Sequence, residues 1–290
     1  MFIKIFLSNY FKNNLFTSKH KLIDEGTYGY IYKFSINNKD FIVKIFKEFN
    51  FNIFNNNELS FAKKCIQMKQ KCPNIVEFYS IGIIIEPSNL NIHKKKCIIM
   101  KCYTPLHIYL EFLKTNKKLN KNTITDILID VFNGCQWISN NFNISHTDLK
   151  IDNILVDLKT NNYIISDFGI NAKSNDYYYC KNKFKYSGDI TMFPFYNCYY
   201  KKFVLYSIGV LLLNIMGISK KNLTNMNHCN YIDIINNAFN ISNINDIYLM
   251  KIFKLLIEYN YFFTPDMKYY ISKYEKSHTK IDTQSYLFFI

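Results

Sequence analysis

The pattern of hydrophobic and polar positions divides the chain into a strand-rich first part and a helical remainder. From residue 19 to about residue 100, short apolar runs alternate with polar turns, and residues 55–70 form the one helix-like stretch. Beyond that point, apolar residues recur at helical spacing in residues 106–115, 123–142, 203–217 and 246–260. A strand-rich insert over residues 153–170 separates the second of these helices from the third. The pattern predicts an α+β fold with two lobes and a boundary at residues 101–105.

The chain's start and its most apolar stretch indicate a cellular location. Residues 1–13 are apolar but interrupted by Lys4, Ser8 and Asn9, so they lack the apolar core and cleavage site of a signal peptide. The most apolar stretch, residues 203–218, is shorter than a bilayer span and contains Asn214. We therefore expect an intracellular protein without a membrane span, in the cytoplasm or nucleus, of a host cell if the source is a virus.

Composition narrows the class of protein further. Of the 290 residues, 49% are hydrophobic and 18% aromatic, which is enough to bury a sizeable core and excludes a disordered chain. The 8 glycines and 5 prolines are too few for a collagen-like or low-complexity chain. All 36 basic residues are lysine, and asparagine occurs 38 times. AT-rich codon usage explains both excesses, so neither indicates a function.

The net charge of +14 favours acidic partners such as phosphoproteins, nucleic acid or an anionic surface. The lysines are scattered, however, and the longest run is Lys94–Lys96. A lysine-solvated surface explains this distribution, with a nucleic-acid-binding face as the alternative. The eight cysteines form no C-x-x-C pair and no zinc-like cluster with histidine, which is typical of reduced intracellular thiols.

One segment carries the residue types that phosphoryl transfer needs. The run from His146 to Asn153 reads H-T-D-L-K-I-D-N, and an Asp-Phe-Gly triplet follows at Asp167. The carboxylate of Asp148 can accept a proton from a hydroxyl nucleophile, and Lys150 can neutralise charge on a transferring phosphoryl group. Asn153 and Asp167 offer the hard oxygen ligands that Mg²⁺ prefers.

A second group of residues lies upstream, within the strand-rich part. The sequence D-E-G-T-Y-G, with glycines at Gly26 and Gly29, separates two predicted strands. Glycines let backbone N–H groups approach phosphate oxygens. One strand later, Lys44 occupies an apolar strand, where a buried ammonium needs an anionic partner. Nucleotide phosphates and the carboxylate of Glu58 are the candidates.

In this order, the glycine turn, strand lysine, H-x-D-L-K-x-x-N and D-F-G motifs resemble the eukaryotic protein kinase family. The resemblance covers about residues 20–217. It implies a two-lobed protein-kinase-like fold over residues 17–290, with a β-rich lobe at 17–102, a helical lobe at 103–290 and a short extension at 1–16. It also implies ATP and Mg²⁺ as cofactors and a protein substrate, which the net charge suggests is acidic.

The resemblance implies a role for each matched position. Asp148 and Lys150 are the expected catalytic residues, and Asn153 and Asp167 the expected metal ligands. The expected nucleotide-binding residues are Asp24, Gly26, Thr27, Gly29, Ile31, Ile42, Lys44, Glu58, Met100, Lys101, Tyr103 and Leu155. Within this set, Met100 takes the gatekeeper position and residues 101–103 the hinge. Lys150, two residues after Asp148, resembles the serine/threonine branch of the family.

The sequence also departs from the family pattern at five positions. Asp24 replaces the first glycine of the loop, and Ile42 replaces an alanine that would face the adenine. Thr147 stands where the family has an arginine that gathers a phosphorylated activation loop, so we expect activity that does not depend on that phosphorylation. Phe195 replaces the glutamate of the A-P-E motif, and Val204 replaces an aspartate that supports the catalytic loop. We further expect Thr191 to contact Asp148.

Three functions remain open at this stage. The first is an active serine/threonine protein kinase, which the presence of all five chemical residues favours. The second is a pseudokinase or scaffold that binds nucleotide or partner proteins, which the departures favour. The third is a small-molecule phosphotransferase, although such enzymes generally lack a lysine at position 150 and the D-F-G triplet. The sequence does not define the substrate, the regulator or the oligomeric state.

Overall fold

The computed structural model describes residues 4–7, 20–26, 29–36, 39–47, 53–87, 92–116, 119–179, 189–227 and 229–258. The chain divides into two compact units. The β-rich unit comprises Met1–Tyr103 together with Asp167–Gly169, and the helical unit comprises Thr104–Ser166 and the chain from Ile170. The predicted α+β class, with strands first and helices afterwards, is confirmed.

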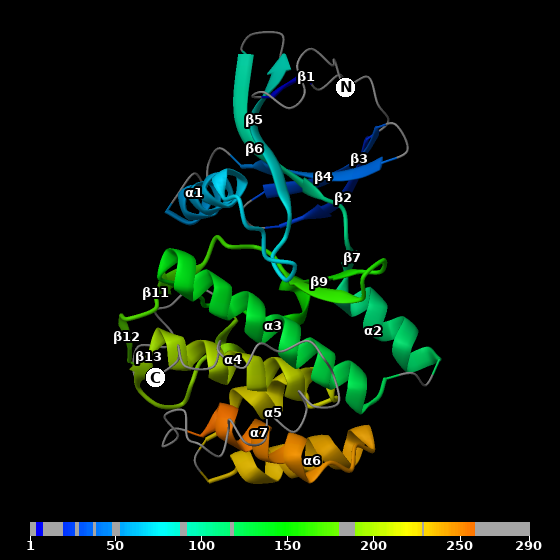
Figure 1. Ribbon diagram of the computed structural model, residues 1–290, viewed down its shortest axis with the longest axis vertical. Helices are drawn as coiled ribbons and strands as arrows, with labels where there is room; N and C mark the ends of the chain where they lie inside the picture. The colour runs from blue at the N-terminus through cyan, green and yellow to red at the C-terminus, as the bar shows by residue number, and fades with distance from the viewer. Residues whose placement is uncertain are drawn as a thin grey trace. The chain divides into compact units, whose positions relative to one another are not determined.

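A six-stranded antiparallel sheet of order β1-β5-β6-β4-β3-β2 forms the frame of the β-rich unit (Figure 1). Its strands are β1 (Lys4–Leu7), β2 (His20–Glu25), β3 (Gly29–Ile36), β4 (Lys39–Phe46), β5 (Phe78–Pro87) and β6 (Ile92–Lys101). The helix α1 (Ile53–Gln67) packs against β5. The strand and helix patterns of the sequence therefore predicted this unit well, apart from β1.

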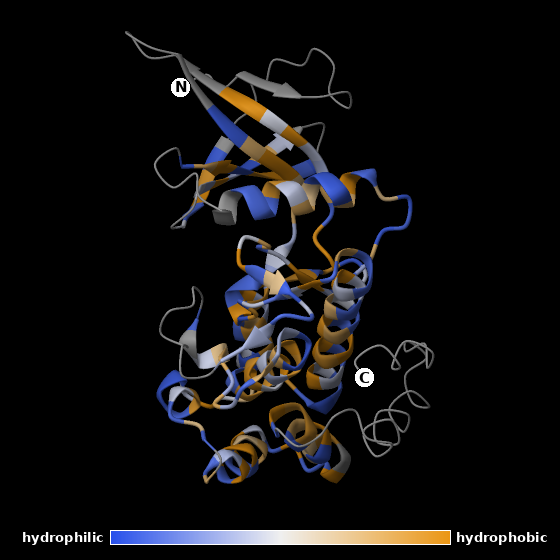
Figure 2. Ribbon diagram, turned by 90° about the vertical axis from the view of Figure 1, so that its left-hand side faces the viewer, coloured by the Kyte–Doolittle hydropathy of each residue, from blue (hydrophilic) through white to orange (hydrophobic). Residues whose placement is uncertain are grey.

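Alternation along β4 decides which face of the sheet receives its lysine. Val43 and Ile45 are buried in one apolar cluster with Phe34 and Ile99. Successive side chains of a strand point to opposite faces, so Lys44 faces away from this cluster. Figure 2 shows the resulting mixture of apolar and polar residues along the strands. The sheet thus buries its core on one side and presents an ammonium group on the other.

The strand β1 lies in the part of the chain expected to be a short extension before the β-rich lobe. It pairs antiparallel with β5, with Lys4 opposite Ile85 and Leu7 opposite Gly82. Residues 4–7 are therefore part of the sheet. The remaining residues of the 1–16 extension lie outside the described part of the chain.

Within the residues that the structure describes, the helical unit contains six helices and several short strands. The helices are α2 (Leu106–Thr115), α3 (Lys121–Phe142), α4 (Tyr200–Ile215), α5 (Lys220–Thr224), α6 (Tyr231–Ser242) and α7 (Ile247–Ile257). The strands are β7 (Thr104–Pro105), β8 (Ile144–His146), β9 (Ile154–Asp157), β10 (Asn162–Ile165), β11 (Asn171–Lys173), β12 (Tyr177–Tyr178) and β13 (Cys198–Tyr199). The described residues of this unit also contain the 3₁₀ turns η2 (Ile151–Asn153) and η4 (Ile190–Met192).

The helix α4 forms the core of the helical unit. Nearly all of its residues are buried, which is the pattern of a helix covered on every side. It contacts α3, α7 and β8. A Cβ atom at Gly209 would lie 2.8 Å from the Ile257 side chain, so glycine is needed where α4 meets α7. No helix among the described residues is long and apolar enough to cross a membrane.

Candidate active site

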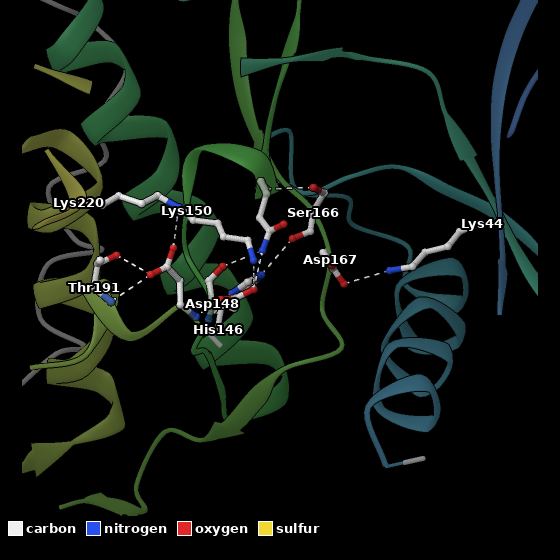
Figure 3. A network of polar contacts seen from close by, with 10 residues as sticks. Lys44, His146, Asp148, Lys150, Ser166, Asp167, Thr191 and Lys220 are labelled. Atoms are coloured by element: carbon white, nitrogen blue, oxygen red, sulfur yellow. Dashed lines mark hydrogen bonds and ion pairs between the residues drawn. The ribbon is translucent and has the colours of Figure 1, made fainter. Parts of the chain in front are cut away.

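The strand β4 places Lys44 against two carboxylates within the β-rich unit. Lys44 lies between Ile31 on β3 and Ile98 on β6, and only 7% of the residue is exposed. Its Nζ donates to Glu58 Oε1 at 3.0 Å and Oε2 at 2.8 Å. The third bond runs to Asp167 Oδ1 at 3.0 Å (Figure 3). The buried lysine therefore has the anionic partner that the sequence required.

The backbone at Asp167 is held in an unusual conformation. Its φ is +58°, in the left-handed region, which costs about 1–2 kcal/mol for a residue with a Cβ. The other described non-glycine residues with positive φ are asparagines at Asn143, Asn161 and Asn243. Strain of this kind persists where the surroundings fix it, and the bond from Lys44 is one such constraint.

Phe168 fixes the Asp-Phe-Gly segment to α1. Its ring is fully buried and stacks on Phe61 with centroids 4.0 Å apart, and it meets Phe78 edge-on at 6.4 Å. Residues three apart lie on one face of a helix, so α1 presents Glu58 and Phe61 together. One face of α1 thus holds both Lys44 and the segment that carries Asp167.

Burial and charge together set the ionisation of this group. Burial raises the pKa of Glu58 to about 7, although the charge of Lys44 acts in the opposite direction. For Lys44, burial acts to lower the pKa, but the carboxylates of Glu58 and Asp167 raise it above its ordinary value. Lys44 is therefore a permanent cation, whereas Glu58 gains a proton near neutral pH.

The two glycines of the predicted phosphate loop have different surroundings. A Cβ at Gly29 would lie 2.5 Å from the Ile45 carbonyl oxygen, whereas a Cβ at Gly26 would be 3.9 Å from its nearest neighbour. The Gly26 N–H donates to the Gly29 carbonyl at 2.9 Å. Thr27, between them, lies outside the described residues. Gly29 is thus required by the close approach of β3 to β4, and Gly26 is free of that constraint.

Asp24, the first departure from the glycine loop, is exposed and bonded locally. Its Oδ1 accepts the Glu25 N–H at 2.8 Å, and Glu25 in turn pairs with Lys47 at 2.7 Å. The β2 strand is irregular between Leu22 and Asp24. The Asp24 carboxylate is thus bonded to the backbone N–H of the next residue.

The remaining nucleotide-site candidates divide between the two units. In the β-rich unit, Ile31 and Ile42 are half-buried, and Ile42 lies opposite Met100 on β6. The Lys101 N–H donates to the Glu77 carbonyl at 2.9 Å, and its ammonium lies 4.9 Å from the ring centroid of Tyr103. Leu155 lies on β9 of the helical unit, opposite Pro105 on β7 and Ile164 on β10.

In the helical unit, the carboxylate of Asp148 is held at both oxygens. Its Oδ2 accepts from Lys150 Nζ at 2.8 Å and from Asn153 Nδ2 at 3.1 Å. Its Oδ1 accepts the backbone N–H of Asp189 at 2.8 Å. Asp148 is 4% exposed, so these bonds compensate for the burial of a carboxylate. The predicted catalytic pair, Asp148 and Lys150, is therefore in direct contact.

His146 ties the Asp148 loop to the residue that precedes Asp167. Its Nδ1 accepts the Asp148 N–H at 3.2 Å, so the ring hydrogen lies on Nε2, which donates to the Ser166 carbonyl at 3.0 Å. Ser166 also donates through its N–H and Oγ to the Asn153 carbonyl, at 2.9 and 3.0 Å. His146 and Ser166 thus have positioning roles.

Asn153 and Asp167 each carry an oxygen of the kind that magnesium binds. Both contacts of the Asn153 amide nitrogen go to Asp148, which leaves its amide oxygen as the atom suited to a metal. Asp167 supplies a carboxylate that is 39% exposed. Oxygen ligands of this kind, completed by substrate phosphates and water, are the preference of Mg²⁺. Within the described part of the chain, no three His, Cys, Asp or Glu side chains form a metal-binding group.

The residues at the three departures in the helical unit are held by side-chain packing or by a backbone hydrogen bond. Thr147 is buried, and its N–H donates to the Ile170 carbonyl at 3.3 Å. Val204 is 2% exposed within α4. Phe195 packs edge-on against Tyr206 at 5.8 Å and lies 6.3 Å from Tyr231. An aromatic cluster therefore stands where the family pattern has a glutamate.

Sequence reasoning missed several residues that support the site. The bonds of Thr191 run to the carboxylate of Asp189, and it is the N–H of Asp189 that reaches Asp148, so the expected direct contact of Thr191 is corrected. Lys220 also pairs with Asp189. No motif in the sequence pointed to Asp189.

Comparison with known families identifies the family in which the residues around Lys44 and those around Asp148 occur. A family model described as protein tyrosine and serine/threonine kinase matches residues 17–259. The chain belongs to this protein kinase family. The predicted two-lobed kinase fold is thereby confirmed, with β1 lying before the matched range. No curated protein gives a significant match to the sequence. The kinase model covers both tyrosine and serine/threonine enzymes.

Proposed function

We propose that the protein is an active serine/threonine kinase that transfers the γ-phosphoryl group of ATP to a protein hydroxyl. The observation that carries this proposal is the bonding of Lys44 to both Glu58 and Asp167. A protein kinase needs the strand lysine paired with the helix glutamate and the Asp-Phe-Gly aspartate in place. The bonds of Lys44 to Glu58 and Asp167, all within one unit of this protein, support the proposal.

The residues of the helical unit support the transfer step. The substrate oxygen forms a bond to the γ-phosphorus while the bond from that phosphorus to the β–γ bridging oxygen breaks, and ADP leaves with the electron pair. Asp148 accepts the hydroxyl proton on its carboxylate, and Lys150 balances charge on the transferred group. Asn153 holds Asp148 in place through its amide nitrogen.

ATP and Mg²⁺ are the cofactors of this proposal. In the proposed complex, Lys44 contacts the α- and β-phosphates, and the main chain of Gly26 approaches the phosphates. Asn153 and Asp167 would hold the metal, which neutralises phosphate charge when bound. The residues proposed to surround the adenine are Ile31, Ile42, Met100, Lys101, Tyr103 and Leu155.

The choice of serine and threonine rests on Lys150, two residues after Asp148. Its ammonium is 2.8 Å from the Asp148 carboxylate, so in the proposed reaction its positive charge would lie close to the attacking hydroxyl. The net charge of +14 further favours acidic acceptor proteins.

Transfer of γ-labelled phosphate with Mg²⁺ tests the proposal, using acidic and basic acceptor proteins together. The Asp148→Asn variant should transfer about 10²- to 10⁴-fold more slowly, because it removes the general base. Asp152→Asn is the matched control, because this exposed carboxylate in the same loop should leave the rate unchanged. Thermal unfolding should show that both variants fold.

Three results would contradict this assignment. Equal transfer by wild type and Asp148→Asn would exclude the proposed base. Label found on tyrosine alone would overturn the serine/threonine assignment. No label from folded wild type, with Mg²⁺ or Mn²⁺ supplied, would favour a pseudokinase or scaffold.

A further inference from the structure

The backbone of Asp189 holds one oxygen of the catalytic carboxylate. The Asp189 N–H donates to Asp148 Oδ1 at 2.8 Å, while Lys150 and Asn153 bond the other oxygen. The orientation of a carboxylate is set when both oxygens have fixed donors. The position of the Asp189 main chain therefore helps to set the orientation of the base.

The side chain of Asp189 is itself fixed by two residues. Its Oδ1 accepts from the Thr191 N–H at 3.0 Å and from the Thr191 hydroxyl at 2.7 Å. Its Oδ2 pairs with Lys220 Nζ at 3.2 Å. Burial acts to raise the pKa of Asp189, but the bonds from Thr191 and Lys220 lower it below its ordinary value. Asp189 is therefore an ionised carboxylate with three donors.

These donors belong to parts of the helical unit that are anchored in its core. Thr191 lies in η4 and is 3% exposed. The hydroxyl of Ser207, on α4, donates to the Met192 carbonyl at 3.0 Å, which connects η4 to that helix. Lys220 is the first residue of α5, which contacts η4. The chain of contacts thus runs from α4 through η4 to Asp189 and then to Asp148.

We propose that Asp189 is a positioning residue for phosphoryl transfer, fixed by Thr191 and Lys220 so that its N–H aligns the carboxylate of Asp148. This inference rests on the proposed kinase activity. Asp189 takes no part in the chemistry, because its carboxylate faces Thr191 and Lys220 and it acts through Asp148 alone. Lys220 supports it from an exposed position, with 67% of its side chain accessible.

Steady-state kinetics of four variants test the proposal. Asp189→Ala should lower kcat by tenfold or more with little change in the KM for ATP, because the contacts of Lys44 are untouched. Asp189→Asn should recover part of the loss, since its amide oxygen still accepts from Thr191. Lys220→Met should lower kcat several-fold, and the matched variant Lys221→Met should not.

A double-mutant cycle separates positioning from general loss of structure. In an Asp148→Asn background, Asp189→Ala should cause little further loss, because the group it aligns is gone. A full tenfold loss in that background would overturn the proposal. So would an Asp189→Ala enzyme whose kcat is within twofold of wild type.

Amide hydrogen exchange tests the contact without using activity. Exchange of the peptide that covers residues 189–192 should be faster in Lys220→Met than in Lys221→Met. If wild type transfers no phosphate, the kinase proposal fails, and this exchange result alone decides whether the Asp189 contact exists. Equal exchange in the two variants would overturn the contact.

Discussion

At the residue scale, Gly26 and Gly29 have different physical reasons to be glycine. At Gly29 an added Cβ would meet the Ile45 carbonyl oxygen at 2.5 Å, so the requirement comes from the sheet. At Gly26 an added Cβ has room. The reason that we propose for glycine at position 26 is the approach of an ATP phosphate to the main chain.

This difference predicts opposite outcomes for two alanine variants. Gly26→Ala should unfold like wild type but raise the KM for ATP several-fold, because its methyl group would crowd the phosphates. Gly29→Ala should lower the unfolding temperature, because β3 and β4 must move apart. Thermal unfolding and ATP titration of both variants provide the check. A stable Gly26→Ala enzyme with wild-type KM would contradict a phosphate contact there.

The ionisation of Glu58 predicts a pH dependence of activity. Because burial raises the pKa of Glu58 to about 7, the carboxylate takes up a proton as the pH falls through this value. The protonated group no longer pairs with the ammonium of Lys44, so kcat/KM for ATP should fall on the acid side. The stability effect has the other sign: the folded state binds this proton more tightly than the unfolded chain, so this contribution is lost as the pH rises.

Glu58→Gln is the control for this assignment, because its side chain has the same shape and does not titrate. Its residual activity should be lower than wild type at pH 8 and should lack the acid-side decline near pH 7. Titration of the ATP phosphates affects both enzymes alike. An identical acid-side decline in both would assign the titration to another group.

The residue scale also shows which contacts the sequence could predict. Lys44 and Asp148 each belong to a motif of fixed order and spacing, and the contact of Lys44 with Glu58 was expected from such a motif. The pair of Lys220 with Asp189 joins residues 31 positions apart and belongs to no motif. Contacts of that kind depend on how η4 and α5 pack, which local patterns do not report.

At the scale of elements, prediction depended on how strongly each one is patterned. The segment expected at 106–115 is α2 itself, and the starts and ends of α3, α4 and α7 lie within three residues of expectation. The helix α6 was missed because its sequence is rich in asparagine, a weak helix former, although its buried residues keep helical spacing. Its end is also unmarked by glycine, since Asn243 takes the left-handed position.

Strand β1 was missed for a different reason. Four residues are too few to establish an alternating pattern. The residues of β5 that pair with β1 also lie about 80 positions later in the chain. Tertiary pairing therefore decided the structure of a segment whose local pattern was ambiguous.

The burial of Val204 in α4 predicts how the stability of the kinase would change if this valine were replaced by the aspartate of the family pattern. Val204 is buried, and the loop amides of Thr147 and Asp148 already donate to Ile170 and His146. Val204→Asp should therefore bury a carboxylate without a partner and lower the free energy of unfolding by about 3–5 kcal/mol. Val204→Ala, which only removes apolar contacts, should cost about 2 kcal/mol. Urea unfolding measures both, and a Val204→Asp variant as stable as Val204→Ala would show that the loop can supply a donor.

At the scale of the whole molecule, the charge comes from lysine alone. Lysine is a strongly hydrated point charge, whereas arginine binds phosphate through two parallel bonds. Without arginine, the protein has a positive field but no bidentate clamps, so its attraction for an acidic acceptor acts over distance and is not specific to one group. Such attraction raises the encounter rate and is screened by salt.

The positive electrostatic field of the protein predicts how kcat/KM depends on the charge of the acceptor and on the ionic strength. Since the screening length falls from about 10 Å at 0.1 M salt to about 3 Å at 1 M, the kcat/KM for an acidic acceptor should fall several-fold over that range. The loss should appear in KM, because kcat depends on Asp148 and its bonded neighbours. A neutral acceptor, made by replacing Asp and Glu with Asn and Gln around the same serine, should show little change. Equal salt dependence for the two acceptors would mean that local contacts at the acceptor serine, and not the net charge of +14, select the substrate.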